Sequence, residues 1–207
     1  MKLVWLAMWA VAASAQDKTE HTFGTTVVST SGFQGRIYNL AQGTADLPRL
    51  DRLEPVGTIY TNTLNVWPQR FDQGFPGITK RFEWFAIDYE AKFWIEQDGE
   101  YRFSLLSDDG ARLEVGGKLV IDNGGTHAPQ GISGSAVLSR GVHTMRVSYF
   151  QGPRFTVALV LAIGPPGERW RIFNTDEFVP PKDSAEWVKG KVGRVRKGAL
   201  GDPQKED

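Results

Sequence analysis

Two adjacent carboxylates, Asp108 and Asp109, are the side chains best suited to chemistry in this sequence, and they lie within the segment Ser107-Asp108-Asp109-Gly110. Calcium takes roughly six to eight oxygen ligands, and each carboxylate can supply one or two of them. Neighbouring strand residues normally point to opposite faces, so both side chains reach one ion only where the backbone departs from a regular strand. The residue types therefore allow a Ca²⁺ site at Asp108 and Asp109.

The same segment also has a purely structural interpretation. Asp108 can accept hydrogen bonds from backbone N–H groups, while Asp109 and Gly110 form a hairpin corner. In that case the two carboxylates serve only the fold, and no ion is bound.

A second group of polar residues begins the glycine-rich segment from Asn123 to Gly134, which is expected to be a loop. Asp122, Asn123 and His127 are close in sequence, and the loop can bring them beside the aspartates as ligand-binding residues. Their alternative role is to satisfy backbone polar groups within the loop itself.

Tryptophans provide a third kind of candidate, because an aromatic ring on a polar face can stack against a sugar ring. Trp84 and Trp94 fall on the same face of a predicted strand, opposite its apolar residues. Either ring can instead be covered by another sheet or by the C-terminal tail. Trp67, which precedes Pro68, is expected to pack at a strand end.

The elements that position these residues are strands. Apolar side chains recur at every second position from Phe85 to Ile95, and this period puts them on one buried face. Asp-Gly and Gly-Gly pairs then separate further short alternating runs, as hairpin turns do. The continuous apolar run from Val157 to Ile163 is typical of a central strand covered on both faces. We predict an all-β fold, an antiparallel β-sandwich or partly closed barrel.

The chain divides into four predicted parts. Residues 1–15 combine Lys2, an apolar run and a small-residue triplet, which is the pattern of a cleaved signal peptide and predicts a secreted or periplasmic protein. Residues 16–31 are polar and are expected to form a linker or a loose strand. The β-sandwich domain is predicted over 32–180, and residues 181–207 are expected to form a flexible basic tail.

Composition excludes several classes of function. Lys and Arg number 24, as do Asp and Glu, so the basic excess of a nucleic-acid binder is absent. The chain has no cysteine, which excludes disulfides and thiolate sites. The apolar run near the start is too short to span a membrane, so no membrane insertion is expected. No nucleophile elbow, phosphate loop or HExxH motif is present, which argues against an enzyme.

The central block SDDGARLEVGGKLVIDNGGTH, residues 107–127, resembles the protective-antigen-type ("PA-fourteen") domain family. The resemblance extends to the early aromatic strand GFQGRIYNL at 32–40, to Gly141-Val142-His143 and to the final apolar strand. It implies a β-sandwich or barrel-like module, often attached to glycosidases, adhesins and toxins and in several members carbohydrate-binding.

In the adhesin branch of that family, two consecutive aspartates hold a calcium ion that binds sugar hydroxyls, and their positions match Asp108 and Asp109. That branch uses a second loop for further ligands. By position the loop corresponds to residues 151–154, where Gln151 has a side-chain oxygen. Nothing in this segment matches the second loop residue by residue, so the specificity is not carried over.

We therefore expect an exported, non-catalytic carbohydrate-binding or adhesion module at the cell surface, whose partner is a glycan or polysaccharide and whose binding depends on calcium. A structural module with protein partners is the alternative from a different class. A stand-alone or accessory polysaccharide hydrolase is a weaker alternative, because no pair of catalytic carboxylates can be nominated from the sequence.

Overall fold

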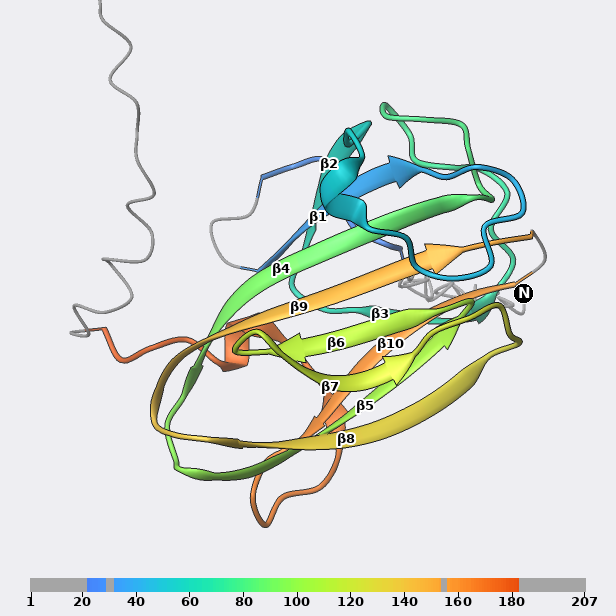
Figure 1. Ribbon diagram of the computed structural model, residues 1–207. Helices are drawn as coiled ribbons and strands as arrows, with labels where there is room; N and C mark the ends of the chain where they lie inside the picture. The colour runs from blue at the N-terminus through green and yellow to red at the C-terminus, as the bar shows by residue number, and fades with distance from the viewer. Residues whose placement is uncertain (1–21, 29–31, 154–155, 183–207) are drawn as a thin grey trace, which may run out of the picture.

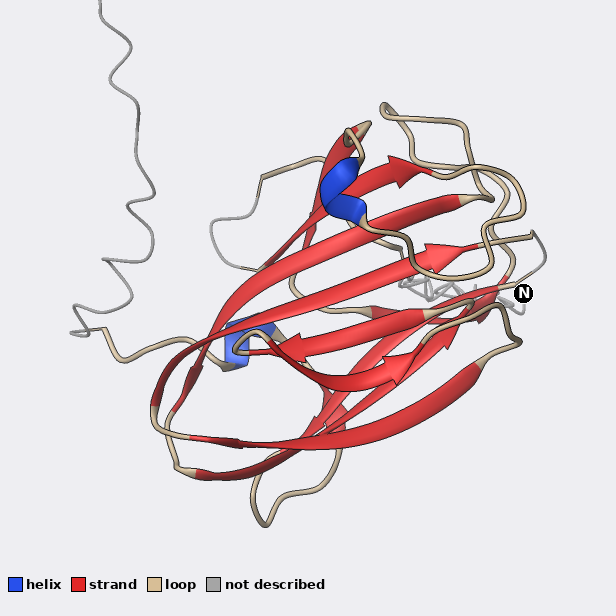
Figure 2. Ribbon diagram, viewed as in Figure 1, coloured by secondary structure: helices blue, strands red, loops and turns tan. Residues whose placement is uncertain are grey.

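Alternating apolar residues become the long strands of an all-β fold in the computed structural model, which describes residues 22–28, 32–153 and 156–182 (Figures 1 and 2). The structure forms two antiparallel sheets packed face to face, and the described residues form no closed barrel. This confirms the predicted fold class. In the described part of the chain, helix is limited to two short 3-10 turns, η1 (Leu50–Arg52) and η2 (Thr175–Glu177).

The larger sheet has six strands in the order β2-β1-β4-β9-β6-β7. Its two longest strands, β4 and β9, pair over eleven residues and run across the width of the molecule in Figure 1. The bounds of its strands are β1 Phe33–Asn39, β2 Gly57–Thr61, β4 Phe85–Ile95, β6 Ala111–Val115, β7 Lys118–Asn123 and β9 Gly141–Gln151.

The smaller sheet has the order β11-β10-β5-β8, and β3 also pairs with β10. Its strands are β3 Asn65–Gln69, β5 Gly99–Asp108, β8 Gln130–Leu138, β10 Val157–Gly164 and β11 Arg171–Ile172. The central position of β10 fits its continuous apolar sequence.

The expected loop from Asn123 to Gly134 is shorter than predicted, because β8 already begins at Gln130. Ile132, Gly134 and Ala136 face inward, and they alternate with the exposed residues Gly131, Ser133 and Ser135. Glycine and serine weaken the strand signal, so this alternation is hard to detect without the partner strand β5.

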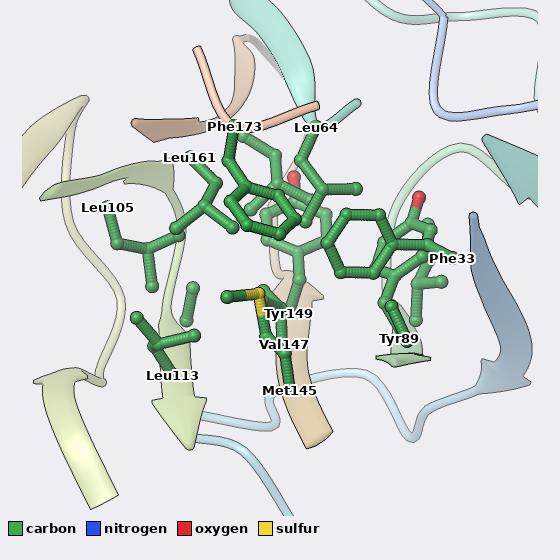
Figure 3. Packing of buried hydrophobic residues seen from close by; sticks show 14 of the residues in the cluster. Phe33, Leu64, Tyr89, Leu105, Leu113, Met145, Val147, Tyr149, Leu161 and Phe173 are labelled. Carbon is green, nitrogen blue, oxygen red and sulfur yellow. The ribbon is translucent and has the colours of Figure 1, made fainter. Parts of the chain in front are cut away.

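The main core lies between the two sheets and is rich in aromatic rings (Figure 3). Tyr89 and Tyr149 from the larger sheet are fully buried beside Phe33 and Phe173. Phe23 also belongs to this core, with its ring 5.5 Å from that of Tyr149. Phe23, from the segment predicted to be a linker or loose strand, therefore contributes its side chain to the core.

The chain after β10 folds back onto the sandwich. Phe173 and Phe178 are buried and their rings stack at 5.0 Å. The predicted signal peptide, residues 1–15, lies outside the described residues, as does most of the predicted tail. Across the described segments, no helix has the length and apolar character needed to cross a membrane.

Candidate functional site

The predicted aspartates lie at one end of the smaller sheet. Asp108 is the last residue of β5 and pairs with Ala158 of β10. The chain then turns through Asp109 and Gly110 into β6. The end of β9, at the right of Figure 1, lies alongside, because Phe150 N donates to the Gly110 carbonyl at 2.9 Å. The two sheets therefore meet at the aspartate pair.

Asp109 connects two loops to this corner. Its Oδ1 accepts a hydrogen bond from His127 N at 3.0 Å, and its Oδ2 accepts one from Gly152 N at 2.8 Å. The carboxylate is 3% exposed. In the structural interpretation, backbone N–H groups were expected to donate hydrogen bonds to Asp108. In the structure they donate to Asp109.

Asp108 has a different environment, although it is only 7% exposed. No hydrogen bond or ion pair from the described residues reaches its carboxylate. Its main-chain carbonyl lies 2.7 Å from the Tyr149 hydroxyl, and the peptide bond between Asp108 and Asp109 is cis. The structure therefore contains a nearly buried carboxylate without a partner in the described part of the chain.

Both carboxyl groups have raised pKa values. Burial, and then the negative charge of Asp109, raise the pKa of Asp108 to about 6, while His127 opposes the shift. Burial also raises the pKa of Asp109, although the hydrogen bonds from Gly152 and His127 counteract it. A bound cation would favour the charged forms of both groups.

The carboxylate oxygens of Asp108 and Asp109 suit a hard cation that takes further ligands from elsewhere. No described residue donates to the carboxylate oxygens of Asp108, and each Asp109 carboxylate oxygen retains a lone pair beyond its amide hydrogen bond. No cluster of three or more His, Cys, Asp or Glu side chains suited to a metal occurs among the described residues. An ion at Asp108 and Asp109 would thus complete its shell with water, backbone carbonyls or ligand hydroxyls.

Asn123 and His127 lie beside the aspartates and organise the loop between β7 and β8. The Asn123 side chain donates to Ser107 Oγ and to the Gln130 carbonyl, both at 2.9 Å, and is 2% exposed. The His127 ring nitrogens lie 2.9 Å from the Ala128 carbonyl and 3.1 Å from the Asn123 carbonyl. Both side chains bind backbone carbonyls of this loop, which is the role that the alternative interpretation gives them.

Asp122 belongs to a neighbouring ion-pair group on the surface. Arg112 binds Asp122 and Asp46, both at 2.9 Å, and Asp46 in turn accepts from Gly125 N at 3.1 Å. These contacts fix the start of the loop that carries His127. Asp122 is therefore close to the site in sequence, but its carboxylate is used by Arg112.

Gln151 is completely buried at the end of β9. Its Oε1 lies 2.6 Å from the Tyr149 hydroxyl, and its Nε2 donates to the carbonyls of Pro153 and Thr156. The structure thus uses both ends of this amide to shape the loop that follows β9.

The two candidate tryptophans are at opposite ends of β4, about 33 Å apart at ~3.3 Å per residue. A Cβ on Gly152 would lie 3.5 Å from the Trp84 ring and 3.1 Å from Asp109 Oδ2, so Trp84 borders the aspartates. Trp94 is 6% exposed and lies beneath Arg140. The structure brings only Trp84 to the site.

Trp67 differs from its prediction. It was expected to pack at a strand end, but it is 51% exposed on β3. The sequence gives little indication of this exposure, because Pro68 interrupts the alternation of apolar and polar residues. The face on which Trp67 lies depends on how β3 pairs with β10.

A cavity of about 610 Å³ is lined by residues 22–26 and 69–76 together with Ile59 and Ile78. Its walls include Phe23, Phe71 and Phe75, which are core aromatics, and it contains none of the predicted site residues. The chemistry of the carboxylates, not this cavity, therefore marks the candidate site.

The family model described as PA14 domain matches residues 36–169. The chain belongs to the PA14 domain family. This confirms the resemblance found in the central block. A search of curated proteins finds no match to this PA14 domain.

Solved structures show the same fold. One is described as a PA14 sugar-binding domain from RTX adhesin, with TM-score 0.61, 20% identity, and coverage of 72% of this chain and 97% of that one. The Epithelial Adhesin 9 A domain from Candida glabrata, in complex with Galb1-3GlcNAc, has TM-score 0.52 at 14% identity, covering 75% and 93%.

A third is an anti-sigma factor domain-containing protein, with TM-score 0.56 at 18% identity. The match covers 74% of this chain but only 50% of that protein's length. At these identities the three structures establish the shared fold.

Proposed function

We propose that this PA14 domain is an exported, non-catalytic module that binds glycans through a calcium ion held by Asp108 and Asp109. One observation carries the proposal: the Asp108 carboxylate is nearly buried, lies next to a second carboxylate and has no partner among the described residues. Two like charges withdrawn from water require compensation, and a divalent cation supplies it.

The chain's own residues have distinct tasks in this proposal. Asp108 offers both oxygens to the ion, while Asp109 offers its remaining lone pairs and is oriented by the amides of His127 and Gly152. Calcium, when bound, would accept vicinal sugar hydroxyls as neutral oxygen ligands. The sugar-binding description of the RTX adhesin domain and the glycan complex of the Candida adhesin support this role.

Calcium titration of the full chain tests the ion site. At a concentration 100 times its dissociation constant, calcium should stabilise the fold by about 2.7 kcal/mol and raise Tm by about 5–10 °C, and EDTA should reverse the shift. Asp108→Asn should abolish the response. Asp51→Asn is the matched control, because Asp51 is exposed and its ion pair is with the equally exposed Arg49.

Glycan arrays with and without calcium test the ligand. We expect calcium-dependent retention of neutral glycans that Asp108→Asn loses and Asp51→Asn keeps. An unchanged Tm with calcium, together with equal retention by both variants, would rule out the ion site.

A structural role for the pair is the second candidate, and one observation favours it: the two amide hydrogen bonds to Asp109 join the loops at 127 and 152. It predicts no calcium response, no glycan retention and loss of stability in Asp109→Asn alone. The same titration therefore separates the two functions.

A further inference from the structure

Strand β8 forms an edge of the smaller sheet, and its outer side has no partner strand in the described part of the chain. It ends the order β11-β10-β5-β8 and lies in the lower half of Figure 1. Its nine residues, Gln130–Leu138, all pair with β5 without a register shift. In an antiparallel pair, half of the N–H and C=O groups of an edge strand point away from the neighbour. β8 therefore presents a long row of backbone hydrogen-bonding groups.

The neighbouring strand β7 approaches β8 from inside the sandwich and does not pair with this edge. A Cβ on Gly134 would collide with the Val120 carbonyl, so β7 packs against the inward face of β8. No ladder between β7 and β8 occurs among the described strands. On the opposite face, Ser133 and Ser135 are exposed and Val137 is 84% exposed. The edge is therefore accessible.

The other sheet edges have features that natural proteins use to prevent strand addition. β2 is covered, because Thr25 and Tyr60 exchange two backbone hydrogen bonds. β3 contains Pro68 and a register shift against β10, and β11 has two residues. β7 has six residues and carries Lys118 and Asp122. β8 has none of these features, since its sequence QGISGSAVL contains no charge and no proline, and it is suited to pair with another strand.

We propose that β8 pairs antiparallel with β8 of a second copy, so that this PA14 domain forms a two-fold dimer with one continuous sheet. Gly134 is the middle residue of β8, and an axis at Gly134 pairs all nine residues. On the exposed face, Ser133 then lies opposite the partner's Ser135, and Gly131 lies opposite the partner's Val137. These pairs bring no charges together, and serine pairs across strands contribute hydrogen bonds. The edge is thus complementary to itself over its full length.

The pairing provides enough contacts for a weak dimer. Antiparallel pairing forms about one hydrogen bond per residue, so nine residues give about nine, close to the number in a typical protein interface. The partner strand also covers part of Val137, the most exposed of the large hydrophobic side chains in the described segments. Because the contact area of a single strand pair is small, we expect a dissociation constant in the micromolar range.

The dimer separates the two aspartate pairs. Gln130 begins β8 and pairs with Ser107, the residue before Asp108. In the antiparallel dimer the two sites therefore lie at opposite ends of the paired strands, about 30 Å apart at ~3.3 Å per residue. Two sites on one continuous sheet would bind a glycan polymer more tightly than a single site. This gain rests on the proposed function, whereas the strand pairing does not.

Sedimentation equilibrium of the full chain in EDTA tests the dimer at about 5–500 µM protein. The wild type should change from monomer to dimer within this range. Ser133→Lys should raise the dissociation constant at least about tenfold, because the two lysines lie diagonally across the axis and an edge lysine opposes pairing. Val56→Lys is the matched control and should keep the wild-type constant, since Val56 is also exposed but precedes β2 in the other sheet.

Cross-linking provides a second measurement with a milder substitution. The chain has no cysteine, so a single introduced thiol reports on one position. A short bismaleimide should join Ser133→Cys into covalent dimers and leave Val56→Cys monomeric. Should Ser133→Lys not fold, the cross-linking of Ser133→Cys decides.

A wild type that remains monomeric throughout the concentration range overturns the proposal, as does equal cross-linking of the two cysteine variants. If Ser133→Lys dimerises as the wild type does, the dimer uses another surface and the β8 pairing is wrong. None of these measurements contains calcium or a glycan. A failure of the ion site is therefore distinguishable from a failure of the dimer.

Discussion

Two buried carboxylates in this domain, Asp88 and Asp108, differ in what surrounds them. Asp88, on the outer face of the larger sheet, is 2% exposed and accepts from Arg146 Nε at 2.8 Å and Nη2 at 2.9 Å. Ser148 Oγ donates to it at 2.8 Å. Asp108 is almost as buried, yet no cation or donor among the described residues serves its carboxylate.

The comparison shows which of the two buried carboxylates lacks a compensating charge among its cross-strand neighbours. Cross-strand neighbours satisfy Asp88, because Ser148 pairs with it in the β4–β9 ladder and Arg146 is two residues away on the same face. The corresponding neighbour of Asp108 is Ala158, which has no polar side chain. A buried charge without a partner is costly, so the site is suited to a cation that the described residues do not provide.

The largest expected effect is at the paired carboxylate. Asp88→Asn leaves the Arg146 guanidinium without its counter-charge and should lower the free energy of unfolding by about 2 kcal/mol. This expected loss is smaller than the cost of breaking a fully buried ion pair, because the Arg146 side chain is 39% exposed. Urea unfolding monitored by fluorescence measures it. A midpoint equal to that of the wild type would remove the contrast with Asp108.

The opposite sign is expected at the unpaired carboxylate. In EDTA, Asp108→Asn should raise the free energy of unfolding by about 1 kcal/mol at pH 7, because it removes a desolvated charge. In calcium the same variant should be less stable than the wild type. If Asp108→Asn destabilises the calcium-free protein as Asp88→Asn does, then Asp108 has a partner and the ion site is doubtful.

The pH dependence of the calcium-free protein provides a weaker test. The pKa of Asp108 is raised to about 6 in the fold, above its value of about 3.9 in the unfolded chain. Between these values the folded state binds more protons, so stability falls as pH rises from about 4 to 6. Thermal melts in EDTA should show this fall in the wild type, and its contribution should be missing in Asp108→Asn. Identical slopes in the two proteins would contradict the assignment.

The smallest effect is expected at the edge of the paired site. Arg36 lies 4.0 Å from Asp88 and 2.5 Å from Glu90, and its side chain is 39% exposed. Exposed ion pairs contribute little, so Arg36→Ala should cost at most about 0.5 kcal/mol. A loss as large as that of Asp88→Asn would show that Arg36 and not Arg146 holds the carboxylate.

Local patterns in the sequence determined most of the framework. The period of two from Phe85 to Ile95 predicts β4 with its observed bounds, and the Asp-Gly and Gly-Gly turns separate β5, β6 and β7. These features depend on neighbouring residues, which is why they can be read without a structure. The adjacent aspartates and the loop residues Asn123 and His127 were visible for the same reason.

Tertiary contacts alone determine which of these side chains have hydrogen-bond partners and which are exposed. Asp109 and Asp108 have identical side chains, but the amides of His127 and Gly152 reach only Asp109. The face of Trp67 depends on a bulge formed with β10, and the burial of Trp94 depends on Arg140. These partners are far apart in sequence. Strand register and loop packing bring them together, and neither can be inferred from the spacing of residues along the chain.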